Sequence, residues 1–136
     1  MKVLLDTNTC IYLIKREPRE VLERLREFRI SEVGISSITY AELCHGVFKS
    51  KKIDMNMTAL DEFVLDLEIA KFDDNAARLY GEIKVLLEKS GQIIGPMDLL
   101  IGAHALSLGI PIITNNEREF KRVPGLEVQN WVKRSI

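Results

Sequence analysis

The sequence predicts an α/β fold in which a short central parallel sheet is covered by helices on both faces. Short apolar runs that end in polar or turn residues alternate along the chain with longer segments whose apolar residues recur at helical spacing. This alternation is typical of parallel sheets, because two parallel strands need a crossover connection, which is usually a helix. The length of 136 residues fits one domain, which we place at residues 1–136.

The predicted strands are short and apolar. The first, at residues 3–5, runs directly into Asp6, and the second is expected at 33–36. Three further strands are expected at residues 68–72, 111–114 and 127–129.

Helices are expected between these strands, and local signals mark several of their ends. Asp73 is a natural N-cap for a long helix that Gly91 ends, and Gly109 ends the next helix. Ser37 or Thr39 is expected to cap the helix after the second strand. The predicted helices span residues 9–16, 18–28, 39–48, 57–66, 73–90 and 97–108.

Composition excludes several classes of protein. Lys and Arg total 19 against 20 Asp and Glu, which argues against tight, purely electrostatic nucleic-acid binding. Cys10 and Cys44 lack metal-type spacing and are expected to be buried free thiols, which fits a reducing, cytoplasmic compartment. No apolar run approaches the roughly 20 residues of a membrane span, so no membrane partner is expected.

Polar clusters follow two of the predicted strands. Asp6, Thr7 and Asn8 follow the first strand, and residues 114–116 (Thr-Asn-Asn) follow the strand at 111–114. Open parallel sheets place their sites outside the carboxyl ends of the strands. The two clusters therefore meet in one cleft if their strands are neighbours.

Two predicted helices add one acid each, Glu42 and Asp98. Each acid has a plain structural explanation: Asp98 suits the dipole of the first helical turn, Glu42 suits an exposed surface, and Asp6 can accept backbone hydrogen bonds in a turn. Together, however, these carboxylates would repel one another, and a hard divalent cation such as Mg²⁺ resolves that conflict. Such a cation activates water and stabilises a leaving phosphodiester oxygen, as one ion or as a pair.

No other catalytic set competes with these acids. His45 and His104 are isolated, and His104 is expected to be a packed or partly exposed polar residue. The sequence contains no P-loop, nucleophile elbow or dinucleotide fingerprint.

With these residues located, the chain resembles the PIN-domain ribonucleases of the VapC toxin type. The likeness runs almost end to end, through four ordered blocks. They are residues 4–8 (LLDTN), 35–43 (ISSITYAEL), 95–105 (GPMDLLIGAHA) and 114–131 (from TNNEREF to NW). The resemblance implies a PIN-like three-layer fold.

The resemblance also implies site residues. Asp6, Glu42 and Asp98 correspond to the metal-binding acids of the family. Asn116 stands where many relatives have aspartate, and Glu119 lies one helical turn further on. Either the site uses three carboxylates, with an amide as a weaker oxygen ligand, or Glu119 completes it.

Neighbouring residues have supporting roles in the same resemblance. Thr7, Asn8 and Thr114 would support the metal ligands by hydrogen bonds. Arg118 has the best position among the basic residues for reaching the substrate. The other candidate phosphate contacts, which also fit ordinary surface charges, are Lys15, Arg16, Lys49, Lys51, Lys52, Lys121 and Arg122.

The implied function is that of a Mg²⁺-dependent endoribonuclease, a hydrolase in which Mn²⁺ can replace Mg²⁺. Such proteins are toxins of toxin–antitoxin pairs, bind a cognate antitoxin protein and commonly form homodimers. One alternative is a catalytically inactive PIN-like module that binds RNA or protein, which Asn116 favours. Another is a phosphatase or receiver-like domain with Asp6 as acceptor, but Thr7 and Asn8 do not supply the second acid it needs.

Overall fold

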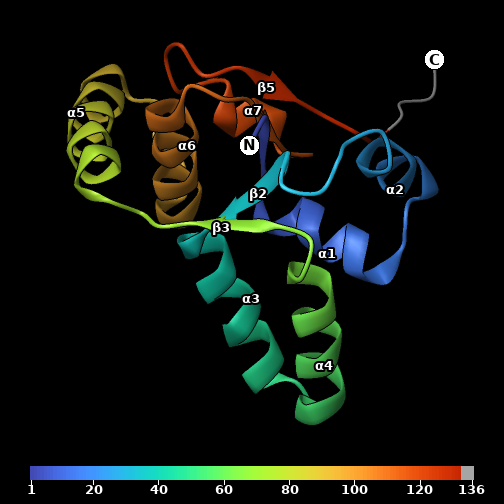
Figure 1. Ribbon diagram of the computed structural model, residues 1–136. Helices are drawn as coiled ribbons and strands as arrows, with labels where there is room; N and C mark the ends of the chain where they lie inside the picture. Colours follow the sequence, from blue (N-terminus) through green and yellow to red (C-terminus); the bar gives the residue numbers. More distant parts are fainter. Residues whose placement is uncertain (133–136) are drawn as a thin grey trace.

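The computed structural model describes residues 1–132. Within them, five strands form one sheet in the order β3-β2-β1-β4-β5, and every neighbouring pair is parallel (Figure 1). Their bounds are β1 (Val3–Leu5), β2 (Val33–Ser36), β3 (Glu68–Ala70), β4 (Ile112–Ile113) and β5 (Val128–Gln129). This arrangement confirms the predicted parallel α/β fold.

Seven helices connect the strands within the same described residues. The long α5 and α6 lie to one side of the sheet, and α1, α2 and α4 lie to the other (Figure 1). Their bounds are α1 (Thr7–Lys15), α2 (Arg19–Leu25), α3 (Ser37–Lys49), α4 (Ile53–Val64), α5 (Asp74–Ser90), α6 (Pro96–Leu108) and α7 (Glu117–Phe120).

The alternation of side chains along β1 produces the two layers of core. Val3 and Leu5 pack in a cluster with residues of α1 to α4, whereas Leu4 packs with Ile101 of α6 and Phe120 of α7. Successive side chains of a strand point to opposite faces, so one strand serves both clusters. Leu4, Leu5, Ile101 and Phe120 are all 0% exposed.

The central position of β1 brings the two polar clusters together. Leu5 pairs with Ile35 of β2 on one side and with Ile113 of β4 on the other. The first strand and the strand before Thr114 are therefore neighbours, as a shared cleft requires. The carboxyl ends of β1, β2 and β4 meet at one edge of the sheet.

One predicted cap is wrong. Ser36, not Ser37 or Thr39, caps α3, because its Oγ accepts a hydrogen bond of 3.0 Å from the N–H of Ile38. The Ser37 hydroxyl instead accepts from the N–H of Phe72, beyond β3. The other caps, Asp73, Gly91 and Gly109, are confirmed.

Both cysteines are free, as predicted, but only Cys10 is fully buried, since Cys44 is half-buried on α3. Trp131 is buried and stacks on Phe28 with 5.6 Å between ring centroids, so it closes the core at the end of the described chain. In residues 1–132, no helix combines the length and apolar character needed to cross a membrane.

Candidate active site

Asp6 lies where the strand β1 ends and the helix α1 begins. Its side chain is the N-cap of α1, and Oδ1 accepts a hydrogen bond of 2.8 Å from the N–H of Thr9. Its Oδ2 accepts a 2.5 Å hydrogen bond from the hydroxyl of Thr114, which directly follows β4. With 2% of its surface exposed, Asp6 is held through both oxygens, one bound by the first turn of α1 and the other by the residue after β4.

Burial raises the pKa of Asp6 above its usual value of 3.8, because a buried carboxylate loses its hydration. The hydrogen bonds from Thr114 and Thr9 act in the opposite direction, and the negative charge of Glu42 adds to the rise. Ionisation of Asp6 is therefore unfavourable in the fold, and a nearby positive charge would stabilise the carboxylate.

Glu42 reaches the same edge from the second turn of α3. Its Oε1 accepts a hydrogen bond of 2.5 Å from the hydroxyl of Thr7, the residue that follows Asp6. The same hydroxyl lies 3.5 Å from Oγ1 of Thr39 in the first turn of α3. Thr7 thus connects the acid of α3 to the segment that carries Asp6, as the resemblance implied.

Asp98 lies in the first turn of α6 and is partly buried. Burial raises its pKa from 3.8 to about 6, with a further rise from the charge of Asp6 and smaller ones from Glu119 and Glu42. A hydrogen bond from Asn116 opposes this rise. The pKa of Asp98 therefore depends on the charges of acids from three other segments of the chain.

Asn116 joins two of these acids. Its Nδ2 donates to Oδ2 of Asp98 at 3.1 Å and to Oε2 of Glu119 at 2.6 Å. Its backbone N–H donates to the Thr114 hydroxyl at 2.8 Å, so the amide is anchored to the residue that also holds Asp6. Asn116 and Glu119 thus both lie beside Asp98, and the neutral amide separates two carboxylates.

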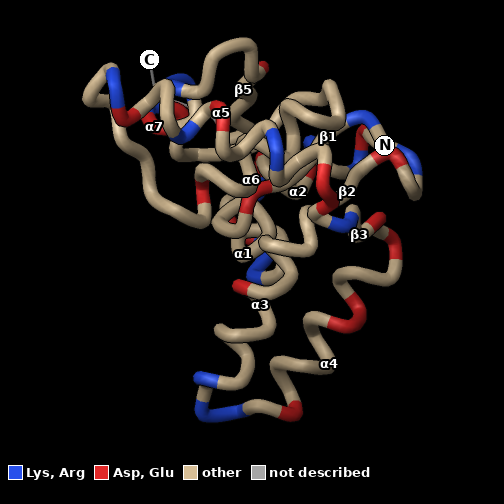
Figure 2. Tube along the Cα trace, turned by 90° about the vertical axis from the view of Figure 1, so that its left-hand side faces the viewer, with Lys and Arg blue, Asp and Glu red and all other residues tan. Residues whose placement is uncertain are grey.

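Two predicted residues do not join this network. Asn8 and Arg118 are exposed, and no side-chain hydrogen bond connects either of them to the acids within the described residues. Figure 2 shows basic residues in short, dispersed groups, one of which lies at the turn between α3 and α4.

Sequence reasoning missed a contact between the helices that carry Glu42 and Asp98. His104 of α6 is 1% exposed, and its Nδ1 lies 2.7 Å from the hydroxyl of Ser36, the N-cap of α3. Burial lowers the pKa of His104 and so favours the neutral ring, whose Nδ1 in the matching tautomer accepts a hydrogen bond from the Ser36 hydroxyl. The available signal was a histidine between Ala103 and Ala105, in a helix turn too apolar for an exposed polar residue.

The donor set of the cleft suits a hard cation, although its geometry is open. Carboxylate and amide oxygens are the ligands that Mg²⁺ prefers, and Mg²⁺ keeps several of its waters when it binds a protein. In the described part of the chain, no three Asp, Glu, His or Cys side chains already stand close enough together to hold a metal ion. Asp6, Glu42 and Asp98 thus supply oxygen donors of the kind that such an ion prefers, but their side chains do not stand at the spacing of a formed metal site.

Comparisons with known proteins identify the family. The PIN domain model matches residues 3–126. The tRNA(fMet)-specific endonuclease VapC of Salmonella typhimurium is 40% identical over 131 residues, which are 96% of this chain and 98% of that protein. Ribonuclease VapC2 of Rickettsia felis is 43% identical over 134 residues, covering 98% of this chain and all of the relative.

Solved structures agree. A DNA-bound VapBC structure from Salmonella typhimurium has a TM-score of 0.92 at 40% identity and covers 97% of this chain and 99% of that one. The VapBC2 structure from Rickettsia felis, bound to a promoter DNA fragment, has a TM-score of 0.90 at 41% identity. The match covers 97% of this chain and 100% of that one. The chain therefore belongs to the PIN-domain family and, within it, to the VapC ribonucleases.

Proposed function

We propose that this protein is a Mg²⁺- or Mn²⁺-dependent endoribonuclease that acts as the toxin of a toxin–antitoxin pair, with Asp6, Glu42 and Asp98 as the residues that hold the cation. The observation that carries the proposal is the convergence of carboxylates from β1, α3 and α6 at one edge of the sheet. Burial raises the pKa of Asp98, the negative charges of Asp6, Glu119 and Glu42 raise it further, and a divalent cation would stabilise the ionised form.

Each acid has a distinct part in this proposal. Asp6 is the rigid ligand, since Thr9 and Thr114 fix its two oxygens. Thr7 orients Glu42. When bound, the cation supplies a water polarised for attack on phosphorus and a positive charge at the leaving oxygen.

Asn116 and Glu119 complete the outer side of the cleft. The Asn116 amide orients Asp98 through its hydrogen bond without adding a charge. Glu119, which receives the shorter bond from the same amide, is the acid available to a water in the hydration shell of the cation. This arrangement favours a site of three carboxylate ligands with Glu119 beside them.

The proposed substrate is a structured RNA with an accessible loop. The relative from Salmonella typhimurium is specific for tRNA(fMet), and at 40% identity over nearly the whole chain we infer the same substrate class, transfer RNA, for this protein. The near-neutral charge of the chain supports recognition of the RNA by local contacts rather than by a strongly basic surface.

The proposed partner is an antitoxin protein, as in the VapBC complexes of the structural relatives. A groove of about 290 Å³ beside Glu42 supports this partner, because its walls are mostly apolar. Its lining includes Ile11, Ile14, Val47 and Leu60. An apolar antitoxin segment would fill the groove and place a basic side chain against Glu42. A homodimer and a cytoplasmic location, which the free thiols support, belong to the same proposal.

The decisive experiment measures cleavage of transfer RNA by purified protein. We expect cleavage with Mg²⁺ or Mn²⁺ and none with EDTA. Asp6→Asn, Glu42→Gln and Asp98→Asn should each lower the rate by about a hundredfold or more, because each removes a ligand charge worth several kcal/mol in the transition state. The matched control is Asp74→Asn, which removes an exposed first-turn acid of α5 and should leave the rate unchanged.

Two outcomes would contradict the proposal. Full activity in EDTA would exclude the cation. Binding of Mn²⁺ without cleavage of any RNA would support a catalytically inactive module, for which Asn116 in place of an acid would be the reason.

A further inference from the structure

Asn115 lies between two residues of the acidic cleft and has an exposed side chain. The residue before it, Thr114, donates to Asp6, and the residue after it, Asn116, donates to Asp98. Consecutive Cα atoms are about 3.8 Å apart, so the Asn115 side chain begins at the rim of the cleft. None of the roles assigned above uses it.

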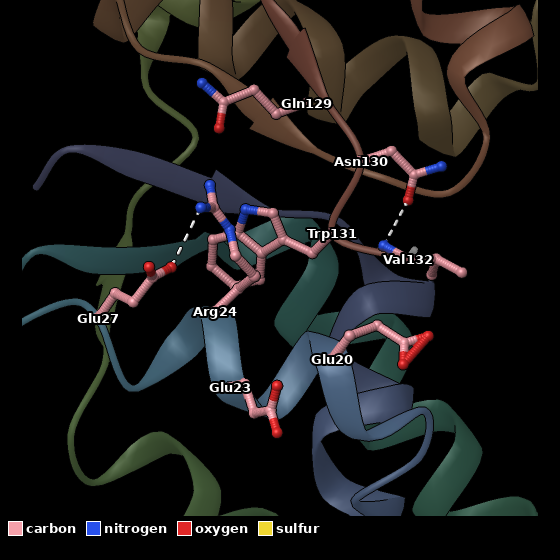
Figure 3. Close-up of a pocket in the computed structure, with 8 residues that line it drawn as sticks. All are labelled: Glu20, Glu23, Arg24, Glu27, Gln129, Asn130, Trp131 and Val132. Carbon is pink, nitrogen blue, oxygen red and sulfur yellow. Dashed lines mark hydrogen bonds and ion pairs between the residues drawn. The ribbon is translucent and has the colours of Figure 1, made fainter. Parts of the chain in front are cut away.

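A chain of hydrogen bonds fixes the orientation of this side chain. The backbone N–H of Val132 donates to Oδ1 of Asn130 at 2.9 Å (Figure 3). The Nδ2 of Asn130 is therefore turned to the other side, where it donates to Oδ1 of Asn115 and to Oε2 of Glu117, both at 3.1 Å. The Nδ2 of Asn115 in turn donates to the hydroxyl of Tyr12 at 3.3 Å. Each amide has one permitted orientation, set by a backbone donor.

The held amide of Asn115 keeps one donor and one acceptor for a ligand. Nδ2 carries two protons and Oδ1 two lone pairs, and the chain of bonds uses one of each. Within residues 1–132, no other hydrogen bond involves this side chain. The donor and the acceptor of one amide together suit the edge of a nucleobase, adenine above all, whose amino group donates beside a ring nitrogen that accepts.

Stability does not explain this arrangement. The bonds of Asn115 to Tyr12 and to Asn130 are both exposed, and an exposed hydrogen bond adds little net free energy to folding because the unfolded chain makes equivalent bonds to water. Holding polar side chains in one geometry also costs conformational entropy. An exposed amide that is nevertheless fixed is suited to binding, since its ordering cost has been met before the ligand arrives.

We propose that Asn115 recognises the edge of one unpaired nucleobase beside the cleaved phosphate, with Tyr12 and Asn130 as positioning residues. Unpaired bases in RNA loops expose such edges, whereas a helical stem hides them. The inference rests on the proposed function, because it needs a phosphodiester held at Asp6 and Asp98.

The test is cleavage of a pool of RNA hairpins whose loop nucleotides are randomised, with sequencing of the cut and uncut molecules. The wild-type protein should prefer one base, adenine, at one position next to the cut. Asn115→Ala should reduce the ratio of cleavage rates between the preferred base and the other bases about tenfold. RNAs with a disfavoured base should be cut at the wild-type rate, because Asn115 makes no bidentate contact with that base even in the wild-type protein. Asn75→Ala, which changes an exposed asparagine of α5, is the matched control and should keep the preference.

Two further variants separate recognition from a structural role. Asn115→Asp replaces the donor by an acceptor, so the preference should change towards bases that present donors, such as the amino group of cytosine. Tyr12→Phe keeps the ring but removes the hydroxyl that orients Asn115, and about a threefold loss of preference is expected. A structural defect would not change which base is preferred.

The outcomes are distinguishable. If Asn115→Ala slows every RNA equally and leaves the base profile intact, Asn115 has no recognition role. If the wild-type protein cuts RNA without any base preference at the loop, the inference is wrong while the proposed function stands. If it cuts no RNA with any divalent cation, the proposed function fails and this inference fails with it.

Discussion

The acidic cleft has a part carried by strands and a part carried by helices, and the two parts are held very differently. Asp6, at the end of β1, is 2% exposed and has both oxygens bound by groups of the fold. Glu42 and Asp98 project from α3 and α6, and each accepts a side-chain hydrogen bond from one neighbour, Thr7 or Asn116. Asp6 is thus fixed on both oxygens, whereas Glu42 and Asp98 are free to adjust to the cation that we propose they bind.

The contact between His104 and Ser36 limits how far that adjustment can go. It joins α6 directly to the N-cap of α3, so the helices that carry Asp98 and Glu42 share one buried hydrogen bond. Phe72 packs edge-on against the imidazole ring, with 5.4 Å between centroids. The helix-borne part of the cleft therefore depends on this buried histidine.

Removal of this contact should have the largest effect on stability. His104→Ala leaves a cavity and removes one of the two hydrogen-bond partners of the buried Ser36 hydroxyl, and we expect a loss of about 3 kcal/mol in the free energy of unfolding. Urea denaturation measures the loss. Mn²⁺ affinity should also fall, because the two helix-borne acids lose their fixed separation.

The matched control is the other histidine. His45 is exposed on α3, and His45→Ala should change stability by less than about 0.5 kcal/mol. Equal stability of the two variants would show that the two parts of the cleft are held independently of His104.

The strand-borne part should respond to the loss of a single hydroxyl. Thr114→Val keeps the shape of the side chain but removes the donor to Asp6 and the acceptor for the N–H of Asn116. We expect a loss of about 2 kcal/mol, because a buried carboxylate and an amide lose a partner. Thermal or urea unfolding measures it, with Thr58→Val on the exposed face of α4 as control.

An unchanged stability of Thr114→Val would contradict the view that Asp6 is held more rigidly than Glu42 and Asp98. If Thr114→Val is as stable as the wild-type protein, the hydrogen bonds of Asp6 do not make its position rigid. The cleft would then lack a fixed ligand, and all three acids would depend on the cation for their positions.

The sequence was sufficient for the strand-borne part and insufficient for the contacts between helices. Asp6 and Thr114 each follow an apolar run, and the rule for parallel sheets places both at one edge. The contact of His104 with Ser36 joins residues 68 positions apart, and that of Tyr12 with Asn115 joins residues 103 apart. No periodicity or spacing encodes such pairs, because they depend on how α6 packs beside the end of β2 and how α1 packs beside the segment that follows β4.

The helix caps and the family motifs also divide into features that the local sequence predicts and features that depend on distant segments of the chain. Asp73, Gly91 and Gly109 were predictable because each acts within one turn of its own helix. The predicted cap of α3, Ser37 or Thr39, was wrong because the helix already begins at Ser37, so that Ser36 is the cap and the Ser37 hydroxyl accepts from Phe72, which is distant in sequence. The family resemblance indicated Glu42 and Asp98, which local patterns alone explain equally well as ordinary helix acids.

The smallest expected effect concerns the charge of Asp98. Its pKa is about 6 in the folded protein against 3.8 for an unperturbed group, so between these values the folded state binds more protons than the unfolded state. Stability without divalent cations should therefore fall as the pH rises from about 4 to about 6. The lowered pKa of His104 acts in the opposite direction below its usual value of 6.5, because protonation of that ring opposes folding.

The variant Asp98→Asn isolates the carboxylate from the histidine, since both proteins contain His104. We expect the variant to match the wild-type protein near pH 4 and to exceed it by about 1 kcal/mol at pH 7, after allowance for the solvent that reaches this partly exposed group. Saturating Mg²⁺ should remove or reverse the difference, because it stabilises only the protein that retains the carboxylate. If the wild-type protein is the more stable at pH 7 without a cation, then the Asn116 hydrogen bond outweighs the repulsion, and the helix-borne part is as well organised as Asp6.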